Sequence, residues 1–418
     1  MNRSTIYAIV CNLLLIPIVT DTRAGISGDT ELRLQVDNTH FGETETSLEQ
    51  WSAIYYKDLS TGLDMGVQFA VEAREANTSG QLYQCYIRSD GKGERPDLTL
   101  GRFEIIENGG FNTLDGISIS QQLSAIDWRV YGGKPRRIEA YWDEDADLLI
   151  GLSSNYDLLS LVQTNQFTQL NFNFGLERRW AHSQQMDLHL SLTGVRPELD
   201  EDLQLNDFHL AADINLDDQS LQRVVVDSHY DLKTQGYLRL GYRYYRPNEE
   251  PETFRDRYHG FFSMERQSIL KGVWYLPKRA GLETNFELNG SRQEQGNGGI
   301  GLATELIYFT HFGSVIDGRV DYMESDDDYA TSIYLRYRQP ITSMSTVELE
   351  SVYQKKQTRL SGDNNLKGLS FSLAHKVLSQ LRLDLSGEWL DHSTRDDEYR
   401  LGLSLRYDFY QTNVGELP

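Results

Sequence analysis

The chain of 418 residues carries a formal net charge of −22, with 62 Asp and Glu against 40 Lys and Arg. That acidic balance argues against sequence-independent nucleic-acid binding, which requires a basic face. The mean hydropathy of −0.51 excludes a helical membrane protein. It leaves room for a membrane β-barrel, because only every second residue of a barrel strand meets lipid.

The N-terminal segment predicts a secretory signal peptide over residues 1–24. Arg3 gives a basic start, and an apolar core runs from Ile6 to Val19, too short for a spanning helix. We therefore expect export of the chain and a single domain over residues 25–418.

From about residue 30 the sequence alternates between apolar and polar residues, the pattern of strands with one dry and one wet face. The first half predicts strands near residues 32–36, 50–58, 62–74, 81–89, 97–106, 114–123 and 126–132. Residues 133–166 are harder to interpret. They contain the acidic run 143–147, and 156–166 fits either a short helix or another hairpin.

The alternation becomes cleaner in the second half of the chain. It predicts strands near residues 169–178, 186–193, 206–216, 220–232, 236–246, 257–266, 268–276, 280–293, 300–311, 314–323, 329–338, 345–357, 366–376, 380–390 and 397–409. The total is roughly 20–24 strands of about 9–13 residues, the length of a tilted membrane-crossing strand.

These strands predict an all-β fold, a single large antiparallel up-and-down transmembrane β-barrel. An open meander of this length would leave two unpaired edges, and closure removes both. A soluble β-sandwich is the alternative, but its strands are usually shorter. We expect the last strand, 397–409, to pair with the strand at Leu32–Val36 and close the barrel.

That last strand also carries a resemblance. Its residues Arg400, Gly402, Leu405 and Tyr407 match the spacing polar-x-Gly-x-x-hydrophobic-x-hydrophobic, which resembles the β-signal of outer-membrane proteins. The resemblance implies that these four residues are an insertion signal for the barrel assembly machinery. One departure is that nine residues follow Phe409.

A second stretch is similar to the Gly-Arg-bearing strands of Gram-negative porins. It comprises residues 98–103 (LTLGRF), 109–111 (GGF) and 115–120 (DGISIS). Together the two stretches resemble a porin-like, Gram-negative outer-membrane β-barrel, without identifying a single family. The resemblance implies a location in the cell outer membrane, in contact with its lipid.

No motif in the sequence predicts an enzyme, a cofactor site or a metal site. Residues 296–301 match G-x-G-x-x-G but lack a following helix. Cys11 falls in the signal, so Cys85 would remain alone, without a disulfide or haem-attachment motif. We expect His189 to be solvated on the polar face of its strand. The acidic runs are expected to be solvated loop charge.

The polar strand faces are the best candidates for a functional surface. If they line a lumen, arginines and carboxylates on adjacent strands form a lattice that either selects solutes by charge or only stabilises the wall. The predicted lumen-lining residues are Arg239, Arg243, Arg336, Arg338, Arg382, Asp384 and Arg406.

We therefore predict a porin-like channel that passes or exports polar solutes. No segment is available as an N-terminal plug, and residues 133–166 are the best candidate for an inward loop. The alternative is a sheath around a periplasmic partner, because barrels of this size resemble the sheath of porin–cytochrome electron conduits. A multihaem cytochrome partner would then supply the haem. A barrel enzyme or adhesin is a third possibility.

Overall fold

The structure is a computed structural model. It describes residues 24–40, 43–58, 60–74, 77–91, 95–107, 110–136, 147–162, 166–180, 184–197, 204–245, 267–293, 298–325, 328–358, 362–393 and 397–412. Residues 1–23, which hold almost all of the predicted signal peptide, lie outside this part of the chain, and Ala24 already belongs to the first strand.

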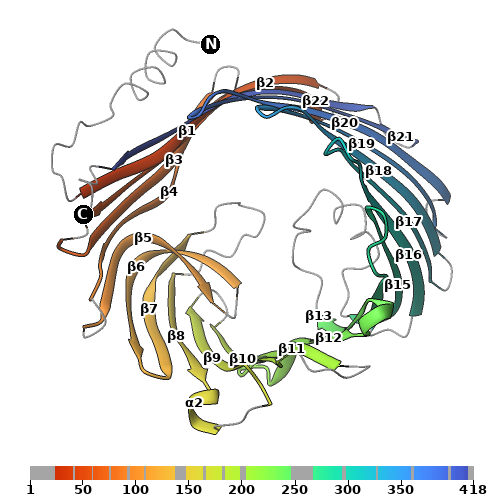
Figure 1. The fold of residues 1–418 in the computed structure, drawn as a ribbon. Helices are drawn as coiled ribbons and strands as arrows, with labels where there is room; N and C mark the ends of the chain where they lie inside the picture. The colour runs from red at the N-terminus through yellow and green to blue at the C-terminus, as the bar shows by residue number, and fades with distance from the viewer. Residues whose placement is uncertain are drawn as a thin grey trace.

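Within these ranges, twenty-two antiparallel strands form one closed barrel, as predicted (Figure 1). The strands of the first half are β1 (Ala24–His40), β2 (Glu43–Asp58), β3 (Leu63–Arg74), β4 (Asn77–Ser89), β5 (Asp97–Glu107), β6 (Gly110–Leu123), β7 (Ile126–Arg136), β8 (Leu148–Asp157), β9 (Gln169–Trp180), β10 (Gln184–Val195) and β11 (Gln204–Asn215). The second half contains β12 (Ser220–Asp231), β13 (Tyr237–Tyr245), β14 (Gln267–Tyr275), β15 (Leu282–Gln293), β16 (Gly298–Phe309), β17 (Val315–Ser325), β18 (Asp328–Thr342), β19 (Ser345–Thr358), β20 (Gly362–Leu378), β21 (Leu381–His392) and β22 (Glu398–Thr412).

The barrel closes between its first and last strands. β1 pairs with β22 from Gly25↔Thr412 to Asp37↔Arg400, and Leu34 lies opposite Leu403. Side chains reinforce this closure near one end, where Asn38 Nδ2 donates to the Asp397 carbonyl and the Tyr399 amide donates to Asn38 Oδ1. The predicted closing contact is confirmed.

The structure contradicts part of the predicted inward loop at 133–166, since residues 133–136 belong to β7 and 148–157 to β8. Within 156–166 the chain forms the four-residue helix α2 (Leu159–Val162), at the periphery of the ring (Figure 1). It is therefore not an inward loop, whereas residues 137–146 of the predicted loop lie outside the described residues. The predicted strand 257–266 also lies outside them. Nowhere in the described ranges is a helix long and apolar enough to cross a membrane.

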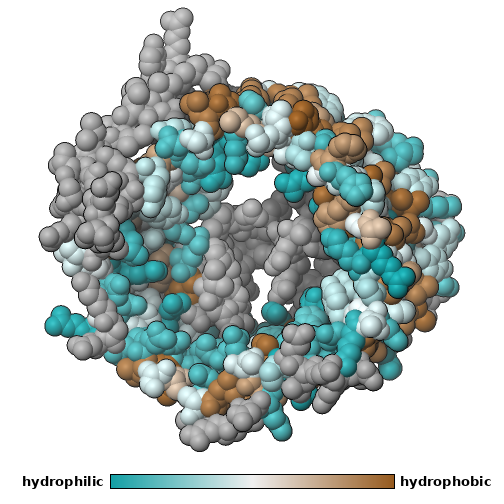
Figure 2. Space-filling model, viewed as in Figure 1, coloured by the Kyte–Doolittle hydropathy of each residue, from teal (hydrophilic) through white to brown (hydrophobic). Residues whose placement is uncertain are grey.

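The outer face of the barrel is apolar and is flanked by aromatic rings. Large apolar side chains such as Leu302, Leu335 and Leu403 are exposed there, and Figure 2 shows hydrophobic residues along the outer rim. Exposed aromatic residues lie on this face near the end with both termini and near the opposite end: Trp274, Phe286 and Tyr308 at the first, Tyr322, Tyr353 and Trp389 at the second. This banding is the pattern of a barrel that meets lipid.

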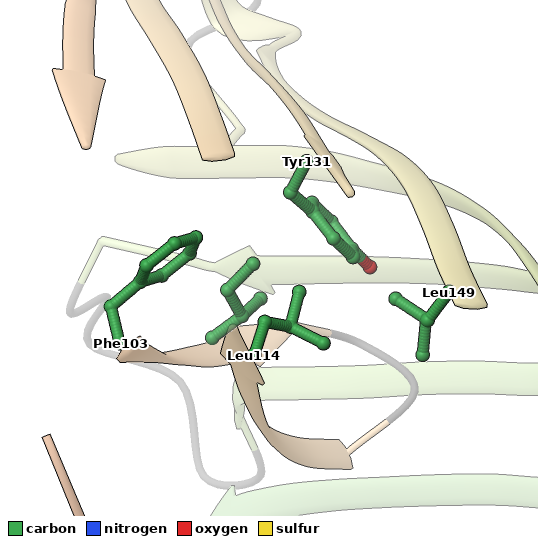
Figure 3. Packing of buried hydrophobic residues seen from close by; sticks show 5 residues of the cluster. Phe103, Leu114, Tyr131 and Leu149 are labelled. Carbon is green, nitrogen blue, oxygen red and sulfur yellow. The ribbon is translucent and has the colours of Figure 1, made fainter. Parts of the chain in front are cut away.

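A buried apolar cluster interrupts the otherwise polar inner face. It consists of Phe103, Ile105, Leu114, Tyr131 and Leu149 from β5 to β8, with Tyr86 packed against it. Figure 3 shows the labelled side chains gathered in one group. Figure 1 shows β5, β6 and β7 curling toward the interior of the ring. The bend of the wall removes these apolar side chains from water, and their burial stabilises the bend.

A row of glycines permits this bend. Gly101 lies opposite Gly116, and Gly116 lies opposite Gly133, on three neighbouring strands. Gly101 has a φ of 114°, a conformation that other residues rarely adopt. A Cβ at position 116 would collide with the carbonyl oxygen of Gly132 and lie 2.7 Å from the Cα of Gly133. Only glycines allow the backbones of β6 and β7 to approach this closely.

Candidate functional site: the charged inner face

The charged inner face is the strand face opposite the apolar band. The predicted residues on β13, β18, β21 and β22 all alternate with exposed outer residues, for example Arg239 with Leu240 and Arg336 with Leu335. Figure 2 shows hydrophilic residues along the inner edge and openings through the middle of the barrel. The structure distributes the seven predicted residues over three separate sectors of the wall.

The first sector centres on Asp227 of β12. Arg239 Nε lies 3.2 Å from Asp227 Oδ1, and Arg243 Nη2 lies 3.8 Å from Oδ2. Gly241 lies directly opposite Asp227, where a Cβ would be 2.9 Å from the carboxylate. The missing side chain at position 241 therefore leaves room for one carboxylate between two guanidinium groups.

Histidine–aspartate pairs continue this sector over β10 to β12. His229 Nδ1 lies 2.6 Å from Asp207 Oδ1, and His189 Nδ1 lies 3.0 Å from Asp213 Oδ1. The expectation that His189 is solvated is wrong, because the residue is only 7 % exposed and its ring packs over Gly175. In the described residues, no three His, Cys, Asp or Glu side chains are grouped so as to hold a metal ion.

The second sector is a buried ion network on β14 to β17. Glu287 Oε1 lies 2.9 Å from Lys271 Nζ, and Glu287 Oε2 lies 3.2 Å from Arg319 Nη2. Arg319 also lies 2.6 Å from Asp321 Oδ1. Glu287 and Arg319 are each 8 % exposed. A buried charge is tolerated only when it is paired in this way.

Arg336 and Arg338 of β18 border that network but bind different carboxylates. Arg336 Nη2 lies 3.0 Å from Asp317 Oδ2 of β17, whereas Arg338 Nε lies 4.0 Å from Glu348 Oε2 of β19. The Asp317 carboxylate is buried, and Arg338 is largely exposed. Two arginines predicted together thus occupy different electrostatic environments.

The third sector lies at the closure of the barrel. Arg382 of β21 is directly opposite Arg406 of β22. Each guanidinium is held by an acid two residues along its own strand, Arg382 by Asp384 at 2.8 Å and Arg406 by Asp408 at 3.0 Å. Arg406 also lies 3.5 Å from Asp29 of β1. Carboxylates therefore offset the repulsion between two like charges that face each other.

The residues of the predicted insertion signal lie on β22 and on both of its faces. Arg400 and Gly402 are on the inner face, where Arg400 Nη1 lies 3.9 Å from Glu388 Oε2. Leu405 and Tyr407 are on the outer face with Leu403. The four residues of the predicted signal are therefore part of the closing strand.

Sequence reasoning missed Lys271 and Arg319 of the second sector and Asp317, the partner of Arg336. All three fall on predicted strands at inner-face positions, so the alternation could have identified them. Their burial depends on neighbouring strands and has no local signal. The arrangement as a whole is a lattice of opposed charges on the inner face of the barrel, and such a lattice produces strong local fields.

A comparison of the sequence with protein-family models and with curated proteins finds no match to either. Solved structures similar to this chain include the P pilus usher (PapC) translocation pore, with 8 % identity, a TM-score of 0.49, and coverage of 92 % of this chain and 99 % of that chain. The outer membrane protein opdK from Pseudomonas aeruginosa has 8 % identity, a TM-score of 0.44, and coverage of 93 % and 99 %. Pseudomonas aeruginosa OccK5 (OpdH) has 12 % identity, a TM-score of 0.44, and coverage of 93 % and 98 %.

Proposed function

We propose that this protein is an outer-membrane channel through which small polar solutes diffuse. The observation that carries the proposal is the division of one closed barrel into an apolar outer band flanked by aromatics and an inner face of paired charges. A soluble barrel gains nothing from exposed leucines on strand after strand, whereas a barrel in lipid requires them. A wide barrel with a wet interior is a pore.

The lumen charges give this channel its selectivity for polar solutes. Arg239 and Arg243 project from β13 toward a single carboxylate, whereas Arg382 and Arg406 are each held by an acid on their own strand. The fields of these pairs point across the pore and act on solutes with separated charges or large dipoles. No cofactor has a part in this function.

The location and assembly of the protein belong to the same proposal. The apolar band contacts outer-membrane lipid, and β22 presents Arg400, Gly402, Leu405 and Tyr407 to the barrel assembly machinery. Export through the N-terminal signal precedes both steps. Fractionation of cells that express the chain should place it in the outer membrane, and retention in the cytoplasm or inner membrane would contradict this part.

Conductance in planar lipid bilayers tests the channel. The purified chain alone should conduct KCl. Replacement of both Arg239 and Arg243 by Gln should raise the cation-to-anion permeability ratio, obtained from the reversal potential, by about twofold. The reason is that Asp227 is left without its two cationic partners. A control that removes two outer-face cations, Arg178→Gln with Lys367→Gln, should leave the ratio unchanged.

Two outcomes would contradict this function. A folded barrel that carries no current without a co-purifying protein is not a diffusion channel, and co-purification of a multihaem cytochrome would favour the sheath. An equal shift of the reversal potential in the control would show that general surface charge, and not the first sector, sets the selectivity.

A further inference from the structure

The wall of the barrel forks between β4 and β5. β5 pairs with β6 along its whole length, from Asp97↔Ser120 to Glu107↔Gly110. With β4 it pairs only from Ser89↔Leu98 to Cys85↔Arg102, and within the described residues the ladder goes no further. The side chains of Asn77–Leu82 on β4 are exposed. The two strands therefore part on the side away from the termini.

The glycine row and the apolar cluster determine the position of the fork. The glycine row at Gly101, Gly116 and Gly133 turns the β5–β6 hairpin inward just where the β4–β5 ladder ends. The apolar cluster holds the hairpin in that position, with Leu114 completely buried. Beyond the fork, β5 and β6 turn toward the interior of the ring (Figure 1). The hairpin thus lies inside the line of the wall.

A charged grid covers the hairpin face opposite the apolar cluster. In one row Arg102, Asp115 and Lys134 lie directly opposite one another on β5, β6 and β7. In the next row Glu104, Thr113 and Arg136 do the same. Three cations against two acids leave a surplus of positive charge. The grid is therefore suited to an anion.

Arg102 is at the centre of the fork. Its Nε and Nη2 lie 2.5 and 2.8 Å from the two Asp115 oxygens, and its Nη1 donates to the Leu82 carbonyl of β4 at 2.5 Å. Arg136 Nε lies 2.7 Å from the same carboxylate. Two guanidinium groups thus converge on one acid, and one of them reaches across the gap between the strands.

Thr113 provides an independent sign of a ligand. Its side chain is 3 % exposed, and its hydroxyl has no hydrogen-bond partner in the described part of the chain. It lies directly opposite Arg136 within the grid. A buried polar group left without a partner costs about 1–3 kcal/mol. An oxygen of a bound anion would accept its hydrogen bond.

The outer side of the fork is apolar. Leu82, Ile87 and Leu100 are exposed there to 41 %, 49 % and 45 %. Ile87 and Leu100 form a directly opposed pair just below the fork. An anionic group bound at the grid is therefore adjacent to a surface for a hydrocarbon chain.

We propose that the fork binds an amphiphile with a phosphate head group and a hydrocarbon chain, which enters sideways from the membrane. The head group occupies the grid at Arg102, Thr113 and Arg136, and the chain lies along Leu82, Ile87 and Leu100. The proposal rests on the membrane location in the proposed function but is independent of what passes through the lumen.

The native thiol of Cys85 reports on the fork. Cys85 is exposed and lies directly opposite Arg102. The full chain, purified in a neutral maltoside detergent, is treated with N-ethylmaleimide, and the alkylation rate at Cys85 is measured with dodecyl phosphate, butyl phosphate or inorganic phosphate. Dodecyl phosphate should slow alkylation about tenfold, and the two short ligands should have little effect, because burial of the longer chain adds most of the affinity.

Variants identify the head-group site. Arg102→Gln and Arg136→Gln should abolish the protection by dodecyl phosphate, Thr113→Val should weaken it, and Arg102→Lys should keep part of it because the charge remains. The Arg178→Gln variant, which is changed on the outer face of β9, is the control. In it dodecyl phosphate should protect Cys85 as strongly as in the unmodified chain. The difference in electrophoretic mobility between boiled and unboiled samples shows whether the barrel of each variant is folded.

Three results would overturn the proposal. The first is an unchanged alkylation rate with dodecyl phosphate, and the second is equal protection in the Arg102→Gln and Arg178→Gln variants. The third is equal protection by inorganic and dodecyl phosphate, which would refute entry from the membrane. KCl conductance of the same preparation reports separately on the proposed channel.

Discussion

The walls of β14–β22 and of β4–β8 are built from the same kind of strand but behave differently. From β14 to β22 the ladders run along nearly whole strands, and the inner face is charged and paired. From β4 to β8 one ladder is short, and the inner face contains a closed apolar cluster. Charged inner side chains can remain in contact with water, so they are compatible with a round wall. Apolar inner side chains are stabilised when the wall bends and buries them. The inner face therefore decides whether the wall stays round or bends.

The largest effect should come from filling the glycine row. We expect Gly116→Ala to destabilise the barrel by about 3 kcal/mol or more, because the new Cβ meets backbone atoms of β7 that cannot move aside. Gly290→Ala in β15 is the matched control, since no atom lies within 4 Å of that Cβ. Urea unfolding in detergent measures both. Equal losses would show that the bend does not depend on the glycines.

The apolar cluster should be next in size. Leu114 is completely buried, so Leu114→Ala should cost about 3 kcal/mol through lost burial and a cavity. Leu288 on the outer face of β15 is 57 % exposed, and Leu288→Ala should cost less than half as much. The unfolding midpoints of the two variants give the comparison. A larger loss at Leu288 would mean that the cluster does not hold the bend.

The buried ions of the round wall should matter slightly less. Glu287→Gln leaves Lys271 without its close carboxylate and removes one of the two acids on Arg319, which should cost about 2–3 kcal/mol. Glu348→Gln breaks only the 4.0 Å contact with exposed Arg338 and should cost about 0.5 kcal/mol or less. Unfolding in urea checks both values. An unchanged free energy of unfolding in the Glu287→Gln variant would show that the network does not stabilise the barrel.

The smallest effect should come from the turn that joins β2 to β3. Asp58 accepts hydrogen bonds from the Ser60 and Thr61 hydroxyls, which lower its pKa to about 2. Since the folded-state pKa lies below the unfolded value, this stabilisation is present above about pH 4 and is lost as the pH falls toward 2. The difference in unfolding midpoint between Asp58→Ala and the unmodified chain should shrink over that range. A difference independent of pH would assign the effect to the turn backbone.

The round wall could be predicted from sequence and the bend could not, for physical reasons. The alternation in β22 is local, and it predicts that Leu403 lies on the same outer face as Leu34, whereas the pairing of these two residues comes from the structure. The glycines at 101, 116 and 133 are visible in the sequence, but their alignment depends on the register of three strands. The burial of Glu287 likewise depends on Lys271 and Arg319, which lie on strands to either side. Single-strand patterns do not carry such information.

The closure between β1 and β22 has a consequence for the order of folding. The hydrogen bond from Asn38 to Asp397 joins residues 359 positions apart, whereas each hairpin joins neighbours in the chain. Bringing distant ends together costs the most chain entropy, and topologies rich in such contacts fold slowly. The hairpins therefore form first and closure comes last. Until then we expect β1 and β22 to expose bare strand edges, whose unpaired N–H and C=O groups are prone to pair with another chain.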